Sequence, residues 1–248
     1  MKNKGIQIEK EIITHINGKY FDELNINIQT FIINIYSSNL NKNKKFKASK
    51  FYNNYKPDIV IEHNGIKKYI SIKSGKSCSI HQEHIYSFIN FLDNLNCPTQ
   101  VVNELKYFHF NDETKDGTGT IRKNAMNFQE NYYDSIKLIN NFFNRKEIMD
   151  KIIDRLLFTG EYFGIPKAEY IYYGNLENGI WADSEKIKNY LNKKYVFSSA
   201  IHISKLYYQS LHRNLKFELE YEYRRYYVQF KWYSIEEDLK EIIKSKKT

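Results

Sequence analysis

The sequence is poor in residues that break or cross-link a chain. Its 248 residues include 3 prolines, 10 glycines and 2 cysteines, so long flexible linkers are not expected. Cys78 and Cys97 are far apart and form no CxxC pair, which argues against a structural zinc site and a disulfide framework. No apolar run approaches the roughly 18 residues of a membrane span. The start of the chain is amphipathic and contains acids, which favours a cytoplasmic protein over a secreted one.

The overall composition is that of a globular protein with a basic surface. Hydrophobic residues make up 42% of the chain, which excludes disorder and collagen-like repeats. The net charge of +9 points to a polyanion such as nucleic acid, although an anionic membrane surface would attract it too. The chain is also crowded with Ile, Asn, Lys and Tyr, which indicates AT-rich coding. Such coding supplies lysine whatever the function, so the charge is weak evidence alone.

Hydrophobic spacing predicts a mixed α/β fold. Isoleucines at helical spacing predict a helix over residues 5–16, and alternation of apolar and charged residues predicts strands within 215–232. Ser79 resembles an N-cap and predicts a helix over 79–95. The other expected helices lie at 25–37, 122–143, 146–158 and 234–244, and the other expected strands at 169–173 and 200–208. No break in composition divides the chain, so we expect a single domain over residues 1–248.

The stretch 58–73 predicts a β-hairpin. Asn64-Gly65 lies between alternating runs, which is the strongest short-range hairpin signal. A two-residue loop there places Asp58 opposite Ser71. Asp58, Ser71 and Lys73 then share one face of the sheet. The opposite face, which must be the core, carries five isoleucines: Ile59, Ile61, Ile66, Ile70 and Ile72.

A carboxylate and a lysine together suit phosphodiester hydrolysis. A carboxylate such as Asp58 can hold Mg²⁺, which commonly takes one or two carboxylates plus waters and phosphate oxygens. The metal lowers the pKa of a bound water and offsets charge in the transition state. A neighbouring lysine such as Lys73 can orient or deprotonate that water. One carboxylate is little for a divalent cation, so a second is expected.

Three glutamates are candidates for the second carboxylate. Glu62 shares the Asp58 face but lies opposite Lys67, where an ordinary ion pair explains it. Glu83 is expected in the first turn of the next helix, where the helix dipole alone would also favour an acid. Glu9 falls within the isoleucine stripe of the first helix, where a carboxylate is costly unless it is paired or binds metal. A lysine partner is the alternative explanation for Glu9.

These residues resemble the PD-(D/E)XK nuclease superfamily, whose pattern is Pro-Asp, a hairpin, then acid-x-Lys. Pro57, Asp58 and Lys73 match, whereas Ser71 stands where most members carry Asp or Glu. The resemblance implies a restriction-endonuclease-like mixed sheet flanked by helices, with additional C-terminal strands and helices. Residues 1–100 would then hold the catalytic core elements. Residues 101–248 would hold the rest of the sheet and the DNA-recognition elements.

The resemblance also suggests how the serine is compensated. Some type II restriction enzymes carry serine at this position and take the second acid from the following helix, for which Glu83 is the candidate. A glutamate on the first helix recurs in several branches, which suits Glu9. Gln82 and Tyr86 are similar to the Q-x-x-x-Y signature of the RecB-like branch. The resemblance covers about a third of the chain, roughly residues 9–86, and is silent on the remainder.

Other positions could contact nucleic acid or have ordinary structural roles. The polar stretch 39–50 is either a solvated loop or a loop that contacts phosphate. Gln and Arg can read adenine and guanine edges, but the C-terminal arginines could equally pair with nearby glutamates. The DNA-contacting candidates are Lys44, Lys45, Lys47, Lys76, Ser77, Gln82, Arg122, Lys123, Arg213, Arg224, Arg225, Gln229 and Lys231.

The sequence therefore predicts a Mg²⁺-dependent endonuclease that cuts double-stranded DNA, most simply a type II restriction enzyme, with Mn²⁺ as a substitute metal. Asp58, Glu83 and Glu9 would bind metal, and Ser71 and Lys73 would complete the catalytic set. A homodimer and a cognate DNA methyltransferase are the expected partners. Two alternatives stay open. One is a repair, recombination or phage-defence nuclease of the same fold acting on branched, single-stranded or RNA substrates. The other is a DNA-binding module without catalysis.

Overall fold

The computed structural model describes most of the chain. The described residues are 4–52, 55–75, 78–119, 132–161, 166–193, 198–211 and 219–245. The fold divides into two compact units, each built from separate stretches of sequence. Unit 1 comprises Met1–Cys78, Leu157–Tyr190 and Ser234–Thr248, and unit 2 comprises Ser79–Leu156 and Leu191–Tyr233. The single domain expected over 1–248 stays a prediction.

Unit 1 contains a five-stranded mixed sheet with the order β1-β2-β3-β5-β6. Strands β1, β2 and β3 are antiparallel neighbours, β3 and β5 are parallel, and β5 and β6 are antiparallel. The strands are β1 (Lys47–Lys50), β2 (Ile59–His63), β3 (Ile66–Lys73), β5 (Tyr170–Tyr173) and β6 (Ile180–Asp183). The helices are α1 (Lys4–Ile16), α2 (Ile26–Tyr36), α8 (Ser184–Leu191) and α9 (Ile235–Lys244), with 3₁₀ turns η1 (Phe21–Glu23) and η2 (Ser37–Asn39).

The β2–β3 hairpin has the predicted register. His63 lies opposite Ile66 and Ile59 lies opposite Ile70. Asn64 and Gly65 both have positive φ angles, 52° and 79°, which is the requirement of the two-residue turn that matches strand twist. A turn of this kind fixes which residues face the core, because a slip by one residue would exchange the two faces.

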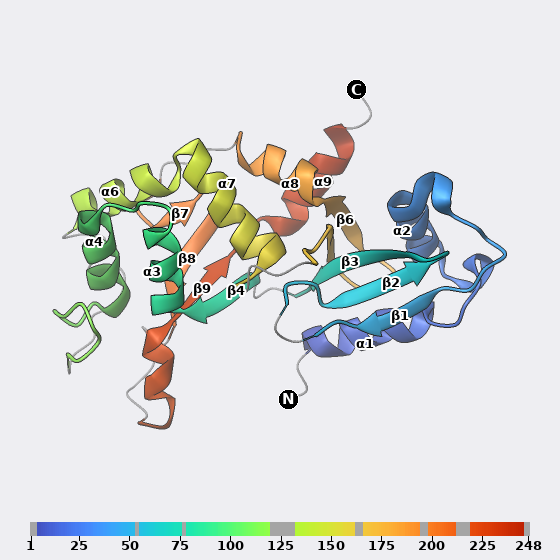
Figure 1. Ribbon diagram of the computed structural model, residues 1–248, viewed down its shortest axis with the longest axis horizontal. Helices are drawn as coiled ribbons and strands as arrows, with labels where there is room; N and C mark the ends of the chain where they lie inside the picture. The colour runs from blue at the N-terminus through green and yellow to red at the C-terminus, as the bar shows by residue number, and fades with distance from the viewer. Residues whose placement is uncertain are drawn as a thin grey trace. The chain divides into compact units, whose positions relative to one another are not determined.

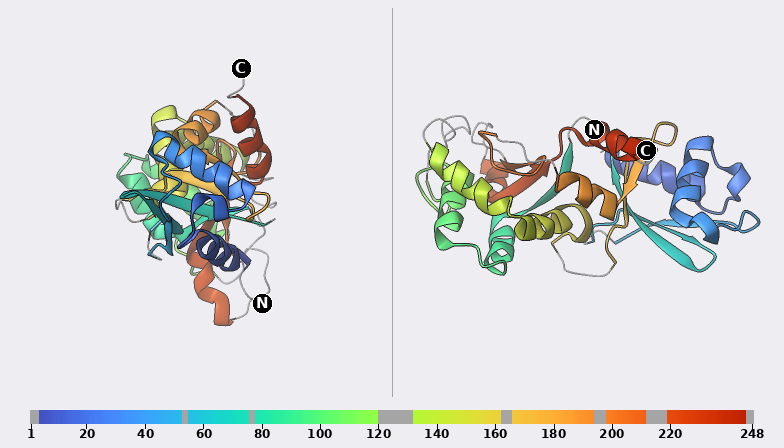
Figure 2. Two further views of the ribbon diagram at one scale, coloured as in Figure 1. Left: turned by 90° about the vertical axis from the view of Figure 1, so that its right-hand side faces the viewer. Right: turned by 90° about the horizontal axis from the view of Figure 1, so that it is seen from above.

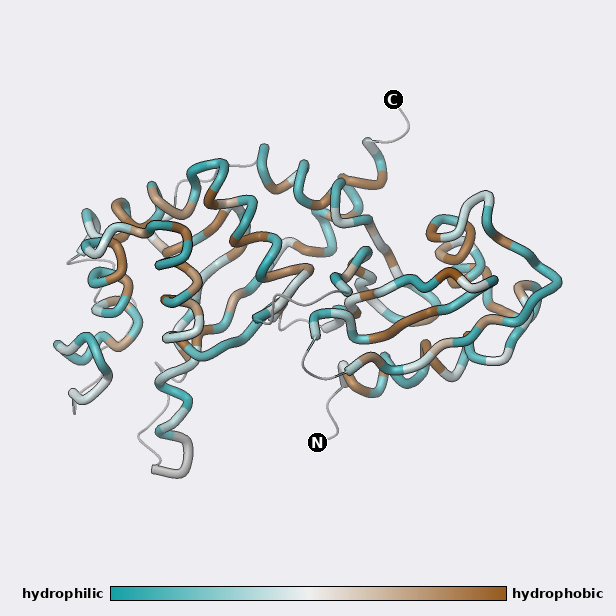
Figure 3. The backbone as a smooth tube through the Cα atoms, viewed as in Figure 1, coloured by the Kyte–Doolittle hydropathy of each residue, from teal (hydrophilic) through white to brown (hydrophobic). Residues whose placement is uncertain are grey.

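The isoleucine face of the hairpin forms the core of unit 1. Ile59, Ile61, Ile70 and Ile72 are buried, and Ile66 packs against the same cluster. The buried sides of α1 and α2 belong to this cluster as well. In Figures 1 and 2 both helices (blue) lie against the blue-green strands of their unit, and α1 runs beside β1. The brown stretches of β2 and β3 in Figure 3 mark the hydrophobic residues of these strands.

Unit 2 contains a second sheet with the order β4-β9-β8-β7, whose paired strands are all antiparallel. Its strands are β4 (Ser79–His84), β7 (His202–Ile203), β8 (Leu206–Ser210) and β9 (Tyr227–Lys231). Its helices are α3 (Ile85–Asp93), α4 (Thr99–Phe110), α6 (Tyr133–Phe143) and α7 (Lys146–Asp154), with the 3₁₀ segment η4 (Leu219–Tyr226). The π-helical turn η3 (Arg155–Thr159) follows α7.

Several sequence predictions of secondary structure are wrong in part. The helix expected over 79–95 begins only at Ile85, because residues 79–84 form β4. The basic stretch 39–50 ends in the edge strand β1 instead of continuing as a loop. Residues 219–226, expected as a strand, form η4. The first part of the helix expected over 122–143 lies outside the described residues. None of the helices in the described ranges has the length and hydropathy needed to cross a bilayer.

Candidate active site

The site lies at the start of β2, where Asp58 directly precedes the strand. The Asp58 backbone N–H donates to the Ile70 carbonyl at 2.9 Å. The Asp58 carbonyl accepts from the Phe51 N–H at 2.9 Å. These two bonds continue the β1–β2–β3 ladder by one residue. The carboxylate is therefore carried by rigid backbone, although it stands outside the strand proper.

One oxygen of the Asp58 carboxylate collects three hydrogen bonds. Its Oδ2 accepts from Ser71 Oγ at 3.0 Å, from the Ile72 backbone N–H at 2.6 Å and from Lys73 Nζ at 3.3 Å. Lys73 Nζ also donates to Ser71 Oγ at 2.7 Å and to the Ile72 carbonyl at 3.0 Å. The predicted shared face of Asp58, Ser71 and Lys73 is thus confirmed, and the three side chains are in direct contact.

The cluster is shielded at its base and open at its carboxylate. Ser71 is fully buried, and the side chains of Lys73 and Asp58 are 15% and 27% exposed. Within the described part of the chain, the other oxygen of Asp58, Oδ1, accepts no hydrogen bond. One oxygen is therefore held in place, and the other remains available to a ligand.

Glu9 of α1 is the second carboxylate of this region. Its side chain is 15% exposed and pairs with Lys50 of β1, with 3.6 Å between Oε2 and Nζ. Burial raises the pKa of Glu9, as does the negative charge of Asp58, while Lys50 and Lys73 act in the opposite direction. A carboxylate whose pKa is raised by burial and by a neighbouring negative charge is one that a bound cation would stabilise in its ionised form. The lysine pair that was the alternative explanation for Glu9 is present.

The donor set suits a hard cation that keeps several waters. No cluster of three or more His, Cys, Asp or Glu side chains with metal-binding geometry occurs among the described residues. Mg²⁺ is commonly bound by one or two carboxylates, with the remaining positions taken by water and phosphate. Among the described residues of unit 1, Asp58 through Oδ1 and Glu9 through its carboxylate could hold such an ion.

Glu83 has a different environment from the one expected. It lies on β4, not in a helical turn, and only 2% of the residue is exposed. Its carboxylate accepts from Arg155 Nε and Nη2, at 3.1 Å to Oε1 and 2.5 Å to Oε2, and from His81 Nε2 at 3.0 Å. Burial raises the pKa of Glu83, but the hydrogen bonds and charges of His81 and Arg155 outweigh it, so the pKa is lowered. The helical placement was wrong, and the metal-binding role assigned to Glu83 stays a prediction.

Glu62 has an ion pair, but not with the residue expected. It lies opposite Lys67 in the β2–β3 ladder, as predicted. Its carboxylate pairs instead with Lys47 on β1, with 3.6 Å between Oε1 and Nζ. The edge strand that the sequence did not reveal supplies this lysine.

The lysines of the basic stretch are exposed and hold local contacts. Lys44 donates to Asn64 Oδ1 at 2.9 Å, and Lys45 lies over the Tyr20 ring at 5.0 Å. The side chain of Lys47 is 79% exposed. All three belong to unit 1, and their contact with DNA stays a prediction.

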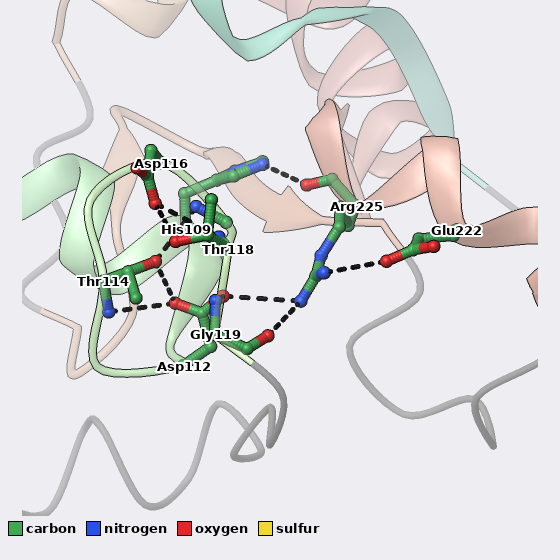
Figure 4. A network of polar contacts seen from close by, with 9 residues as sticks. His109, Asp112, Thr114, Asp116, Thr118, Gly119, Glu222 and Arg225 are labelled. Carbon is green, nitrogen blue, oxygen red and sulfur yellow. Dashed lines mark hydrogen bonds and ion pairs between the residues drawn. The ribbon is translucent and has the colours of Figure 1, made fainter.

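Arg225 is buried in unit 2 and holds several contacts there. It is 7% exposed, and its guanidinium donates to Glu222 Oε1 at 3.1 Å, Asp112 Oδ2 at 3.4 Å and the Gly119 carbonyl at 3.0 Å. Asp112 also accepts from the backbone N–H groups of Thr114 and Gly119 (Figure 4). The alternative, an arginine that pairs with a nearby glutamate, is present, and the contact of Arg225 with DNA stays a prediction. Arg225 ties η4 to the loop that follows α4.

Three glutamines line up across the sheet of unit 2. Gln82 of β4 lies opposite Gln229 of β9, which lies opposite Gln209 of β8. Gln82 and Gln209 are exposed, and Gln229 Nε2 donates to Ser79 Oγ at 2.9 Å. Gln82 and Gln229 are among the candidates expected from the sequence, whereas Gln209 is not, because the expected strand ends at residue 208. The pairing register brings them together on one face.

Two further DNA-contacting candidates have aromatic neighbours. Lys231, also on β9, lies over the Tyr233 ring at 5.7 Å. Arg224 donates to Tyr223 Oη at 3.3 Å. The remaining candidates lie outside the described residues: Lys76, Ser77, Arg122, Lys123 and Arg213.

Comparisons with known proteins give a likeness in structure and none in sequence. No model of a protein family matches the chain, and no curated protein is similar to it. The crystal structure of the restriction endonuclease MspI in complex with its cognate DNA is similar, with a TM-score of 0.58 and 13% sequence identity. The match covers 92% of this chain and 88% of the MspI chain. Together with the mixed sheet and its flanking helices, this likeness shows that the chain has a restriction-endonuclease-like α/β fold.

Proposed function

We propose that the protein is a Mg²⁺-dependent endonuclease that hydrolyses phosphodiester bonds of double-stranded DNA, as a sequence-specific type II restriction enzyme. The observation that carries the proposal is the cluster of Asp58, Ser71 and Lys73, in which one carboxylate oxygen is held and the other is open. The cluster lies in a fold like that of MspI, an endonuclease solved with its cognate DNA.

Lys73 is the residue placed to act on the attacking water. Its ammonium has three acceptors within 3.3 Å, so its position beside Asp58 is narrowly defined. A positioned cation of this kind orients a water molecule and offsets the charge that develops on the phosphate oxygens. When bound, Mg²⁺ would supply a water of lowered pKa and further neutralise that charge.

Ser71 aligns the other two groups in place of an acid. Its hydroxyl accepts from Lys73 Nζ and donates to Asp58 Oδ2, so it fixes their distance without adding negative charge. Because Ser71 brings no negative charge, Glu9 is the second carboxylate proposed for the site. We therefore propose Asp58 and Glu9 as the metal-binding residues, with Mn²⁺ as a substitute for Mg²⁺.

The proposed substrate sets the expected partners. Symmetric cutting of both strands would favour a homodimer, because a two-fold axis places one site on each strand. A cognate DNA methyltransferase would protect the host sequence. An enzyme of this kind would act in the cytoplasm. The three paired glutamines, called the glutamine row, are Gln82, Gln229 and Gln209. Together with Lys231 they are the described groups of unit 2 best suited to read base edges, since glutamine can form two hydrogen bonds with adenine.

The test is a cleavage assay with matched variants. Wild type, Asp58→Ala, Lys73→Ala and the control Lys68→Ala are incubated with plasmid and phage DNA in Mg²⁺ or EDTA. Lys68 lies on the same strand and pairs with Glu169 at 2.8 Å, so it controls for loss of a lysine from β3. We expect discrete fragments that require Mg²⁺, with at least a 1,000-fold loss in Asp58→Ala and little change in Lys68→Ala.

Other outcomes would replace the proposal with a named alternative. Intact DNA together with a gel shift would identify a binding module without catalysis. Cleavage confined to branched, single-stranded or RNA substrates would identify a repair or phage-defence nuclease. Nicking without double-strand cleavage would contradict the symmetric dimer.

A further inference from the structure

Lys50 is a fourth charged residue of the candidate site that the sequence did not single out for catalysis. It is the last residue of β1, and its Nζ lies 3.6 Å from Oε2 of Glu9. The two partners differ in exposure, since the Glu9 side chain is 15% exposed and that of Lys50 is 50% exposed. A mostly buried carboxylate is thus paired with an ammonium that reaches it from the surface.

The backbone of Lys50 is fixed beside Asp58. Lys50 lies opposite Ile59, and the next residue, Phe51, donates its backbone N–H to the Asp58 carbonyl at 2.9 Å. The position of the Lys50 Cα is therefore set by the same ladder that carries Asp58. The long side chain keeps its freedom, because a half-exposed lysine has a flexible four-carbon stem.

The two lysines of the site are held with different strength. Lys73 Nζ has three acceptors at 2.7 to 3.3 Å. Among the described residues, Lys50 contacts one carboxylate, and at a longer distance. A divalent cation placed between Asp58 and Glu9 would repel both ammonium groups. The lysine with the single, longer contact would leave first.

We propose that Lys50 is the counter-ion that Glu9 exchanges for the divalent metal, and that the released ammonium then binds a phosphate of the DNA. This inference rests on the proposed function, because it requires Asp58 and Glu9 to bind the metal. The exchange couples two binding events. Without metal, Lys50 neutralises Glu9 and is unavailable to DNA. With metal, the same positive charge is turned toward the phosphate backbone.

The first test measures metal binding directly, without catalysis. Binding of Mn²⁺ is followed by titration calorimetry for wild type, Asp58→Ala, Lys50→Met and Lys19→Met. Lys19 is the matched control, because its side chain is 47% exposed and its Nζ lies 3.4 Å from Glu23 Oε1. Both residues follow the C-terminal end of α1, which ends at Ile16. Methionine keeps most of the length of the side chain and removes the charge. We expect Lys50→Met to bind Mn²⁺ about 3- to 10-fold more tightly, since a competing positive charge is gone.

The second test measures DNA binding with and without metal. Fluorescence anisotropy with duplex DNA is recorded in Ca²⁺ and in EDTA. We expect Lys50→Met to bind DNA about threefold or more weakly than wild type in Ca²⁺ and equally well in EDTA, whereas Lys19→Met is unchanged in both. A loss of equal size in the two conditions would overturn the exchange, since Lys50 would then contact DNA independently of metal.

The outcomes separate this inference from the proposed function. Mn²⁺ binding that is absent, or unaffected by Asp58→Ala, would overturn the metal site and the inference together. Mn²⁺ binding that depends on Asp58 but is equal in wild type and Lys50→Met would overturn the role of Lys50 alone.

Discussion

Each unit contains a carboxylate paired with a cationic side chain. The two pairs differ in whether one carboxylate oxygen or both accept hydrogen bonds. In unit 2, Glu83 and Arg155 are buried, and Arg155 and His81 bond both carboxylate oxygens. In unit 1, Asp58 and Lys73 are partly exposed, and the hydrogen bonds converge on Oδ2. In the pair of Glu83 and Arg155, here called the closed pair, both carboxylate oxygens accept hydrogen bonds, which suits a structural role. In the pair of Asp58 and Lys73, the open pair, one oxygen can still bind a ligand.

The largest expected effect is on stability, from breaking the closed pair. Glu83→Ala leaves the Arg155 guanidinium buried without its carboxylate, which costs about 3–5 kcal/mol of unfolding free energy. Urea denaturation followed by circular dichroism measures the change. Glu62→Ala is the control, because its pair with Lys47 is partly exposed to solvent and should contribute less than about 1 kcal/mol. Equal, small losses in both variants would show that the Glu83 pair has no special structural role.

The same two regions should respond to acid in opposite directions. The pKa of Glu83 is lowered, so its ionised form stabilises the fold above the ordinary glutamate value of 4.5, and this contribution is lost as the pH falls through the folded-state value. The pKa of Glu9 is raised, so its ionised form opposes folding at neutral pH, and relief comes as the pH falls toward 4.5.

Denaturation of metal-free protein between about pH 7 and pH 3 tests these signs. The stability difference between wild type and Glu9→Gln should shrink as the pH falls from neutrality to the ordinary glutamate value of 4.5. The difference between wild type and Glu83→Gln should persist to 4.5 and shrink only below it. If the stability differences of Glu9→Gln and Glu83→Gln shrank over the same pH range, the opposite signs expected for the two glutamates would be wrong.

The smallest expected effect concerns the glutamine row of unit 2. Gln209→Ala should weaken binding to duplex DNA by about 1 kcal/mol, near fivefold, if the row reads base edges. Anisotropy with AT-rich and GC-rich duplexes measures the loss, which should be larger for the AT-rich duplex. Asn90→Ala on α3 is the control, since Asn90 is an exposed polar residue of the same unit. A loss of equal size for both duplexes would point to contact with the backbone alone.

The register of the hairpin could be predicted from the sequence because the structure is local. The turn at Asn64-Gly65 fixes the register, and the register fixes the neighbours of Asp58. Four isoleucines are buried on one face of the hairpin, so Asp58, Ser71 and Lys73 must lie on the opposite face. The contact of Ser71 and Lys73 with Asp58 follows from these two facts, without knowledge of any other part of the chain.

Two strands, β4 and β1, could not be predicted from the sequence. Strand β4 pairs with β9, almost 150 residues later, and a bulge between Ser79 and His81 interrupts its alternation. With the period of two broken, Ser79 resembled the start of a helix, and Glu83 was placed in a helical turn. The edge strand β1 was hidden for another reason. Lysines are common on edge strands, where they discourage pairing with other chains, and they are equally common in loops.

The order of the chain has a consequence for the newly made protein. Asp58, Ser71, Lys73, Glu9 and Lys50 all leave the ribosome within the first third of the chain. Their sheet is extended beyond β3 only when β5 pairs with it, about 100 residues later, which takes about 5–20 s at ordinary translation rates. Until then one edge of β3 is unpaired, so a nascent chain would hold every proposed catalytic group on an incomplete sheet. Full activity would be delayed until β5 and β6 have been made.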